Sequence, residues 1–176
     1  MKLSEDDLGT LQIASMNAVQ HETRKASGMT KSALRAATNR AAEVLYVALV
    51  AWANSGQSPD AFIFSTTKKA LAAMVMEQSW RGAPSSDYRK ELRFLVASGL
   101  LTVADERSGK RYKVNAVRIL ETGAVEVRDM VARTVDAAIA EGVPETEAKR
   151  RGESFGGHAM ALEYDRLAEK IRRLFP

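Results

Sequence analysis

Cysteine is absent from this chain of 176 residues. Its absence excludes a disulfide framework and a thiolate metal site, and it fits a cytoplasmic protein. Long apolar runs are also missing: the longest, Val44–Ala53, has 10 residues, far short of the roughly 20 that a membrane-spanning helix needs. We expect this run to form a buried core helix. The opening MKLSEDDLGT is acidic where an export signal would need basic and then apolar residues, so we expect no export signal.

Patterns of catalytic residues are scarce as well. The two histidines, His21 and His158, have no further histidine or carboxylate at metal-ligand spacing, so we expect no metal site. Ser65–Lys68 matches the S-x-x-K pattern of acylating serine enzymes but lacks the K-T-G partner, and a helix cap is the better interpretation. Ser108–Lys110 lacks the glycine-rich lead of a phosphate-binding loop. We therefore predict a protein that is not an enzyme and has no cofactor.

Positive charge is present but unevenly distributed. The net charge is +4, yet residues 1–60 carry 6 basic against 6 acidic side chains and residues 121–176 carry 9 against 11. Residues 61–120 carry 11 basic against 5 acidic side chains, so the excess belongs to the middle third. A basic excess confined to one region is typical of a nucleic-acid-binding unit, although a solvated basic face would give the same count.

Apolar residues recur at helical spacing over most of the chain. The segment from Leu3 to about Val19 has loose spacing and predicts a short helix or flexible arm. Gly142–Gly157 is polar without periodicity, so we expect a linker there. Five further helices are predicted. The first covers Ser32–Asn54, and the second covers Thr66–Gln78 with Ser65 as its N-cap. The third begins after a cap at Ser85 or Ser86 and ends at Gly99, and the last two cover about Val125–Glu141 and about His158–Phe175.

Three short segments are typical of β-strands. Ala61–Phe64 is a short run of β-formers and predicts a small edge strand. Leu100–Ala104 and Arg111–Val117 predict a β-hairpin, because the polar segment Asp105–Lys110 between them has the composition of a hairpin loop. The predicted fold class is mostly α with a small β-hairpin, an α+β fold.

The order of helix, short strand, helix, turn, helix and basic hairpin resembles the winged helix-turn-helix family over about Ala41–Val117. The residues that carry the resemblance are STTKKALAAM, SSDYRKELRFLVASGLL and TVADERSGKRYKV. It implies that the second motif helix enters the DNA major groove and that the hairpin touches the backbone or minor groove. The turn Ser79–Pro84 is longer than the usual three or four residues, which leaves the first residue of the recognition helix open.

Basic and hydroxyl side chains in these segments are the candidate DNA-binding residues. Arg89 and Arg93 lie one helical turn apart, and arginine is the usual bidentate reader of guanine. We expect base contacts from Arg89, Lys90 and Arg93. The expected phosphate contacts come from the remaining candidates, which are Lys68, Lys69, Ser85, Ser86, Arg107, Lys110, Arg111 and Lys113.

The last predicted helix carries a clean apolar stripe of Met160, Tyr164, Leu167, Ile171 and Leu174. This stripe can pack back on the domain or against the same helix of a second chain. A major-groove reader gains by presenting two related surfaces, so we favour a homodimer. The predicted regions are an N-terminal helix or arm (1–31), a winged helix-turn-helix DNA-binding domain (32–120) and a C-terminal helical region with an oligomerisation role (121–176).

These features predict a cytoplasmic protein of bacterial or mobile-element origin that binds double-stranded DNA. The expected function is that of a sequence-specific transcriptional regulator that acts by occupying its site, without catalysis. One alternative is a replication-initiation, partition or DNA-packaging factor of a phage or plasmid. Another is a winged-helix protein-protein interaction module, whose basic face would meet an acidic partner and which would bind no duplex DNA.

Overall fold

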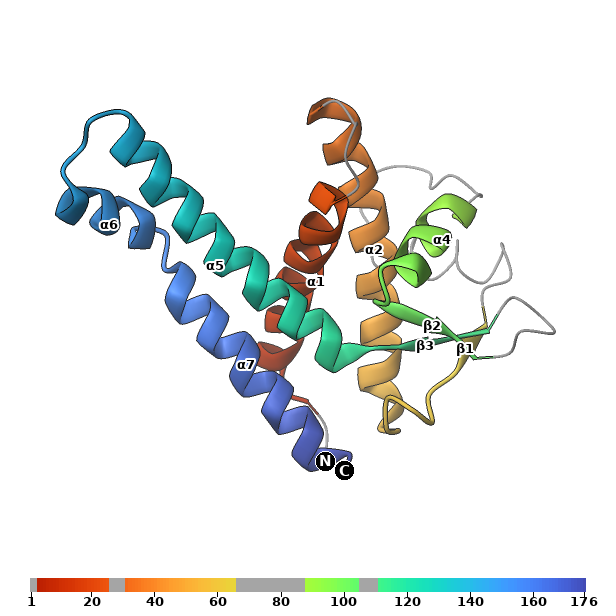
Figure 1. The fold of residues 1–176 in the computed structure, drawn as a ribbon. Coiled ribbons are helices and arrows are strands. Elements are labelled where there is room, and N and C mark those ends of the chain that lie inside the picture. The colour runs from red at the N-terminus through yellow and green to blue at the C-terminus, as the bar shows by residue number, and fades with distance from the viewer. Residues whose placement is uncertain (1–2, 26–30, 66–87, 105–110) are drawn as a thin grey trace.

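The computed structural model describes residues 3–25, 31–65, 88–104 and 111–176 (Figure 1). Mostly helical with a small antiparallel sheet, the fold confirms the predicted α+β class. The predicted helix Thr66–Gln78 and the hairpin loop Asp105–Lys110 lie outside the described residues. The elements are α1 (Glu5–Lys25), α2 (Lys31–Ser55), β1 (Phe64–Ser65), α4 (Arg89–Ala97), β2 (Leu101–Val103), β3 (Arg111–Val114), α5 (Ala116–Ala140), α6 (Glu145–Glu153) and α7 (Gly157–Leu174).

The helix α5 runs through the middle of the molecule and organises the other elements around it. It packs along α7 on one side and against α1 on the other, and α1 in turn packs on α2 (Figure 1). The sheet and α4 lie at the end where α5 begins, whereas α6 lies at the end where α5 stops (Figure 1). No helix in the described part of the chain combines the length and the apolarity that crossing a membrane requires.

One hydrophobic cluster joins the three regions that the sequence suggests. Leu11 from the N-terminal region, Trp52 from the central region and Tyr164 from the C-terminal region all belong to it, and each is 1% exposed. The predicted boundary at residue 120 falls inside α5, which begins at Ala116. The basic central region therefore shares its core with the helices on either side of it in the chain.

The helix α1 is longer and more firmly packed than the sequence predicts. It continues to Lys25, so the expectation of a short helix or flexible arm ending near Val19 is wrong. Its inner face consists mainly of small residues such as Ala14 and Ala18, which are fully buried but give a weak hydrophobic pattern. Gly123 of α5 permits the close crossing, because a Cβ there would lie 2.9 Å from the backbone oxygen of Ala14.

The start of α1 is held to the last helix of the chain. Ser4 and Asp7 form a reciprocal capping box, with Ser4 N–H donating to Asp7 Oδ2 (2.8 Å) and Asp7 N–H donating to Ser4 Oγ (3.2 Å). Lys170 Nζ of α7 donates to the same Asp7 oxygen at 2.6 Å. Burial alone would raise the pKa of the Asp7 carboxyl, but the hydrogen bonds from Lys170 and Ser4 together lower it below its ordinary value. The two ends of the chain therefore stabilise each other.

The C-terminal half differs from the prediction in two places. The helix α5 begins at Ala116 rather than near Val125, so β3 ends at Val114 and not at Val117. The predicted linker Gly142–Gly157 contains the helix α6. Because only Ala148 and Gly152 of α6 are buried, hydrophobic periodicity gives no sign of it. Ion pairs within one turn, such as Glu145–Lys149 (2.6 Å), support the helix instead.

The apolar stripe of the last helix serves this chain's own core. Tyr164, Leu167 and Ile171 are 1%, 3% and 1% exposed, and they pack in the cluster that α1 and α5 also supply. Met160 is partly buried against the same cluster, and Leu174 is half-buried. The prediction of an oligomerisation surface is therefore wrong for Tyr164, Leu167 and Ile171, which pack on the chain's own helices.

Candidate nucleic-acid interface

The helix α4 lies against α2 through apolar and charged contacts that fix its rotation. Leu92 and Leu95 are buried and face the core. Arg40 of α2 donates from Nε to Glu91 Oε1 at 2.7 Å, and its guanidinium carbon lies 5.5 Å from the ring centroid of Tyr88. Since Tyr88 is 5% exposed, it belongs to the docking face.

The opposite side of α4 presents the predicted base-reading residues. Arg89, Lys90 and Arg93 are all exposed, and the two arginines lie one turn apart. Neither Lys90 nor Arg93 forms an ion pair with any residue in the described part of the chain. Because the acidic side chain nearest in sequence, Glu91, is turned inward to Arg40, it does not neutralise this face. A short, firmly docked helix thus carries an outward positive charge.

The end of α4 leads directly into the hairpin through a tight turn. Gly99 has φ +74°, a left-handed conformation that a residue without a Cβ adopts at low cost. Gly99 N–H donates to Val96 O and Leu100 N–H donates to Leu95 O, both at 3.0 Å, which is the pattern of a Schellman motif. The predicted stop at Gly99 is confirmed. Arg118 of α5 also donates to the terminal carbonyl of Ser98 at 3.1 Å.

The hairpin strands place two of the residues predicted to contact phosphates, Arg111 and Lys113, on one face. The antiparallel sheet has the order β1-β3-β2, with Phe64 opposite Tyr112 and Thr102 opposite Lys113. Tyr112 and Val114 are buried, so the alternating residues Arg111 and Lys113 project from the other face. Arg111 is exposed and Lys113 is partly buried, and neither has an ion-pair partner among the residues that the structure describes.

The remaining predicted DNA-binding residues are outside the described ranges. They are Lys68, Lys69, Ser85, Ser86, Arg107 and Lys110. The described helix α4 begins at Arg89 with Tyr88 in the N-cap position and without a side-chain cap, rather than after a cap at Ser85 or Ser86. Arg89 and Lys90 are therefore first-turn residues, where the helix N-terminus adds its own positive field.

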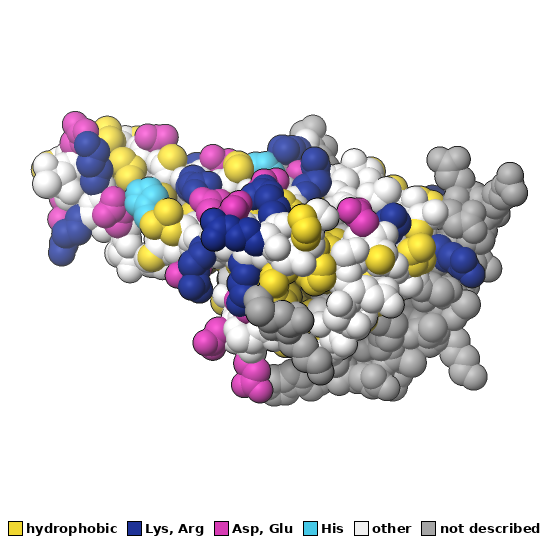
Figure 2. All heavy atoms as spheres, turned by 90° about the horizontal axis from the view of Figure 1, so that it is seen from below, with side chains coloured by type: hydrophobic (Ala, Val, Ile, Leu, Met, Phe, Trp, Pro, Cys, Tyr) yellow, Lys and Arg dark blue, Asp and Glu magenta, His cyan; other side chains and the backbone are white. Residues whose placement is uncertain are grey.

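Charged residues on the C-terminal helices behave differently. On α6 and α7, arginines pair with glutamates one turn away, as in Arg150–Glu147 (2.8 Å) and Arg166–Glu163 (2.7 Å). Figure 2 shows basic and acidic side chains interspersed over the helical part of the face it displays. Neutralisation at short range leaves little field beyond the surface. These arginines are paired, whereas Lys90 and Arg93 of α4 have no ion-pair partner among the described residues.

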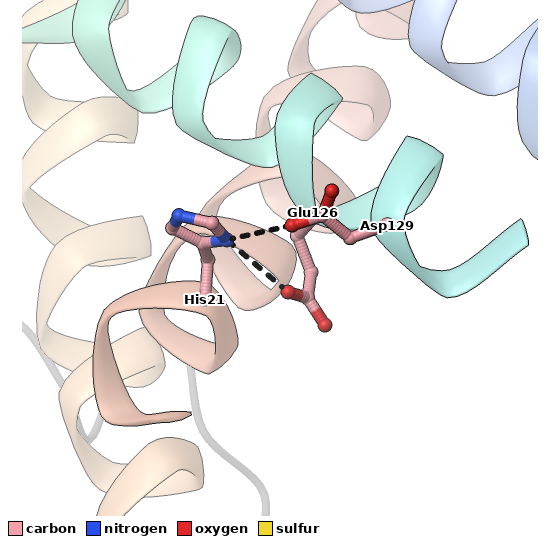
Figure 3. Close-up of side chains that lie close together, drawn as sticks. All are labelled: His21, Glu126 and Asp129. Carbon is pink, nitrogen blue, oxygen red and sulfur yellow. Dashed lines mark hydrogen bonds and ion pairs between the residues drawn. The ribbon is translucent and has the colours of Figure 1, made fainter. Parts of the chain in front are cut away.

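A second cluster joins α1 to α5, and the sequence does not predict it. His21 Nδ1 lies 3.3 Å from Glu126 Oε2 and 3.8 Å from Asp129 Oδ2 (Figure 3). Glu126 is 0% exposed, and Arg24 and Arg133 both approach its Oε1, at 3.0 and 3.1 Å. The expectation that His21 has no neighbouring carboxylate is wrong, because the carboxylates come from a helix about a hundred residues later. Only the spacing Glu126-x-x-Asp129 on one helical face hints at it.

Comparison with known proteins gives no relative from which a function could be transferred: no family model, no curated protein and no solved structure matches the chain. Any function must therefore be inferred from the residues of this chain alone.

Proposed function

We propose that this protein binds double-stranded DNA through α4 and the β2–β3 hairpin and acts as a non-catalytic transcriptional regulator. The observation that carries the proposal is the exposed basic face of α4, with Arg89, Lys90 and Arg93 on a helix whose other side is docked on α2. A groove-reading helix needs this division between one docking stripe and one outward polar face.

The order and pairing of the elements also support the proposal. Among the described residues, the helix α2, the edge strand β1, the helix α4 and the hairpin occur in the order that the resemblance implies, and β1 pairs with β3 in the order β1-β3-β2. The first predicted motif helix, Thr66–Gln78, lies outside these residues. Arg111 and Lys113 share one face of β3, close in the chain to the end of α4. An α-helix fits the major groove, and a basic hairpin beside it can contact the flanking phosphates.

The proposed mechanism divides the work between these two elements. Arg93, with Arg89 and Lys90, contacts base edges and supplies the preference for a sequence. Arg111 and Lys113 neutralise phosphates, which adds affinity without sequence information and releases counterions. The protein would regulate transcription by occupying its site. The homodimer remains a prediction within this proposal, and the burial of Tyr164, Leu167 and Ile171 supports a contact surface elsewhere than on these three residues.

The test is fluorescence anisotropy of the full chain with random duplex DNA and then with a site selected from it, over a series of salt concentrations. The logarithm of the binding constant should fall linearly with the logarithm of salt concentration, with a slope of several units. Arg93→Ala should reduce binding to the selected site by about 1–3 kcal/mol and relax the preference at one base position. Arg111→Ala should weaken all sequences alike and reduce the slope by about 1.

Arg166→Ala is the matched control, because it removes the same charge from α7, where Arg166 is paired with Glu163. It should leave binding unchanged. Absence of duplex binding at low salt would refute the proposal and favour the protein-interaction alternative. Binding that Arg93→Ala and Arg166→Ala reduce equally would show general attraction to the polyanion, and α4 would not be the reading helix.

A further inference from the structure

The cluster between α1 and α5 contains three side chains that can each donate one atom to a metal ion. They are His21 from α1 and Glu126 and Asp129 from one turn of α5 (Figure 3). Their donor atoms all lie within 4.8 Å of one another. None of them belongs to the proposed DNA-binding surface, so this cluster needs an explanation of its own.

His21 and Glu126 form a long hydrogen bond, and the spacing of the three groups also suits a shared ion. Nδ1 of His21 lies 3.3 Å from Glu126 Oε2 and 3.8 Å from Asp129 Oδ2, both beyond the usual N–H···O length of about 2.9 Å. Donor atoms about 2.0–2.2 Å from a tetrahedral zinc ion lie roughly 3.3–3.6 Å from each other. Asp129 is 50% exposed, so its carboxylate has room to close the remaining gap by rotation.

We propose that this cluster is a binding site for a divalent transition-metal ion of the zinc class. His21 Nδ1, Glu126 Oε2 and a carboxylate oxygen of Asp129 provide three ligands from two helices. Imidazole and carboxylate together are a donor set that zinc accepts in proteins. Water completes the coordination on the side where Asp129 is exposed.

Two arginines hold the central ligand in place. Arg24 and Arg133 contact Glu126 through Oε1, which leaves Oε2 turned toward His21. Partners of this kind fix the orientation of a ligating carboxylate. Their positive charges also oppose a dication, and both arginines are about 40% exposed (39% and 43%), so solvent screens part of that repulsion. The site should therefore bind zinc more weakly than a closed structural site with thiolate ligands.

Binding would tie α1 to the centre of α5. His21 lies in the last two turns of α1, beyond its last buried apolar residue, Val19, and Glu126 lies near the middle of α5. A ligand that binds the folded state alone stabilises that state. The ion would thus reinforce the C-terminal end of α1, next to the entry into α2.

The test uses the full chain and the metal alone. After treatment with a chelator and dialysis, Zn²⁺ is titrated by calorimetry, and Co²⁺ is titrated in the visible spectrum as a probe of coordination. The wild type should bind about one ion and gain thermal stability, and Co²⁺ should give the intense bands of tetrahedral coordination. His21→Asn and Asp129→Asn should each weaken binding by about tenfold or more.

His158→Asn is the matched control, because it removes the other histidine, which lies on α7 beside Glu153 (3.4 Å). It should bind as the wild type does. Asp129 is half-exposed, so its replacement leaves the fold intact and keeps the test decisive even where a change at buried Glu126 would unfold the chain. Absence of saturable binding, or binding that persists in both ligand variants and falls in His158→Asn, would overturn the proposal.

Discussion

At the scale of single residues, Tyr164 is a buried side chain whose polar hydroxyl is satisfied by a hydrogen bond. The ring is 1% exposed, and its hydroxyl accepts a hydrogen bond from Asn17 Nδ2 of α1 at 2.8 Å. Burial raises the pKa of the Tyr164 hydroxyl to about 12, and the hydrogen bond from Asn17 lowers it only in part. The neutral hydroxyl is thus the form that the folded state holds.

This raised pKa predicts a loss of stability at alkaline pH. The stability that the buried neutral hydroxyl of Tyr164 contributes is fully present below pH 10, the pKa of the unfolded side chain, and it is lost as the pH rises toward 12. The difference in unfolding free energy between the wild type and Tyr164→Phe should shrink by up to about 2–3 kcal/mol over this range. Urea denaturation of both proteins from about pH 8 to about pH 11.5 measures it. A difference that stays constant over the whole range would contradict this account.

At the scale of elements, the junction between α4 and the hairpin depends on the left-handed Gly99. A Cβ at this position would be strained at φ +74° and would lie 2.9 Å from Arg118 Nε. Since the arginine tip can move, the backbone strain should dominate, and Gly99→Ala should lower the unfolding free energy by about 1–2 kcal/mol. Chemical denaturation measures this free energy, and duplex binding tests whether α4 keeps its orientation relative to the hairpin.

Gly9→Ala is the matched control for that substitution. Gly9 lies in α1, and in the described part of the chain no atom beyond its neighbours and its own helix backbone lies within 4 Å of the position that an added methyl group would take, so alanine should fit without strain. Its higher helix propensity should stabilise the protein by about 0.5–1 kcal/mol. Opposite signs for the two substitutions would tie the effect to backbone conformation. A loss of equal size at both positions would instead indicate a general intolerance of added methyl groups.

The elements that the sequence predicts well are those whose stabilising contacts recur along the chain. The long helix α2, the stop at Gly99 and the hairpin strands all follow from periodicity or from the conformational preference of one residue. The helix α6 could not be found in this way, because its support comes from charged pairs such as Glu145–Lys149 and its buried positions are Ala148 and Gly152. A polar helix and a polar linker have the same composition.

The two candidate sites also differ in how far they could be predicted from the sequence. The basic residues of α4 and β3 are close together in sequence, so their exposure could be predicted from the alternation of apolar and charged positions. The cluster of His21 with Glu126 depends on the packing of α1 against α5. The register of that packing is set by small residues such as Ala14 and Gly123, which carry almost no hydrophobic signal. Contacts of this kind become visible only once the helices are assembled.

At the scale of the whole molecule, the two proposed sites lie on different parts of one framework. The basic elements lie where α5 begins (Figure 1). Glu126 lies near the middle of α5, and His21 contacts it from α1. The helices α1, α2, α5 and α7 share one core cluster, and α1 packs directly on α2. A shift in the position of α1 would therefore alter its packing on α2, on which α4 is docked. Metal binding that stabilises α1 should therefore be compared with DNA affinity measured on the same sample.

Because the buried residues of the α7 stripe pack inside the chain, truncating one of them should destabilise the fold. Leu167 is 3% exposed in the core, so Leu167→Ala should lower the unfolding free energy by about 2–5 kcal/mol. Leu162→Ala makes the same change on the same helix at a residue that is 65% exposed, and it should stay within about 0.5 kcal/mol of the wild type. Urea denaturation at two protein concentrations measures both variants.

The concentration series separates the two arrangements of this stripe. If Leu167 packs within its own chain, its replacement shifts the unfolding midpoint equally at both concentrations, because no association step is involved. If the stripe joined two chains, the wild-type midpoint would rise with concentration and the variant would lose that dependence. A dimer that persists in Leu167→Ala would place the contact between subunits on another surface, and the exposed side of α7 around Leu162 would be the next to test.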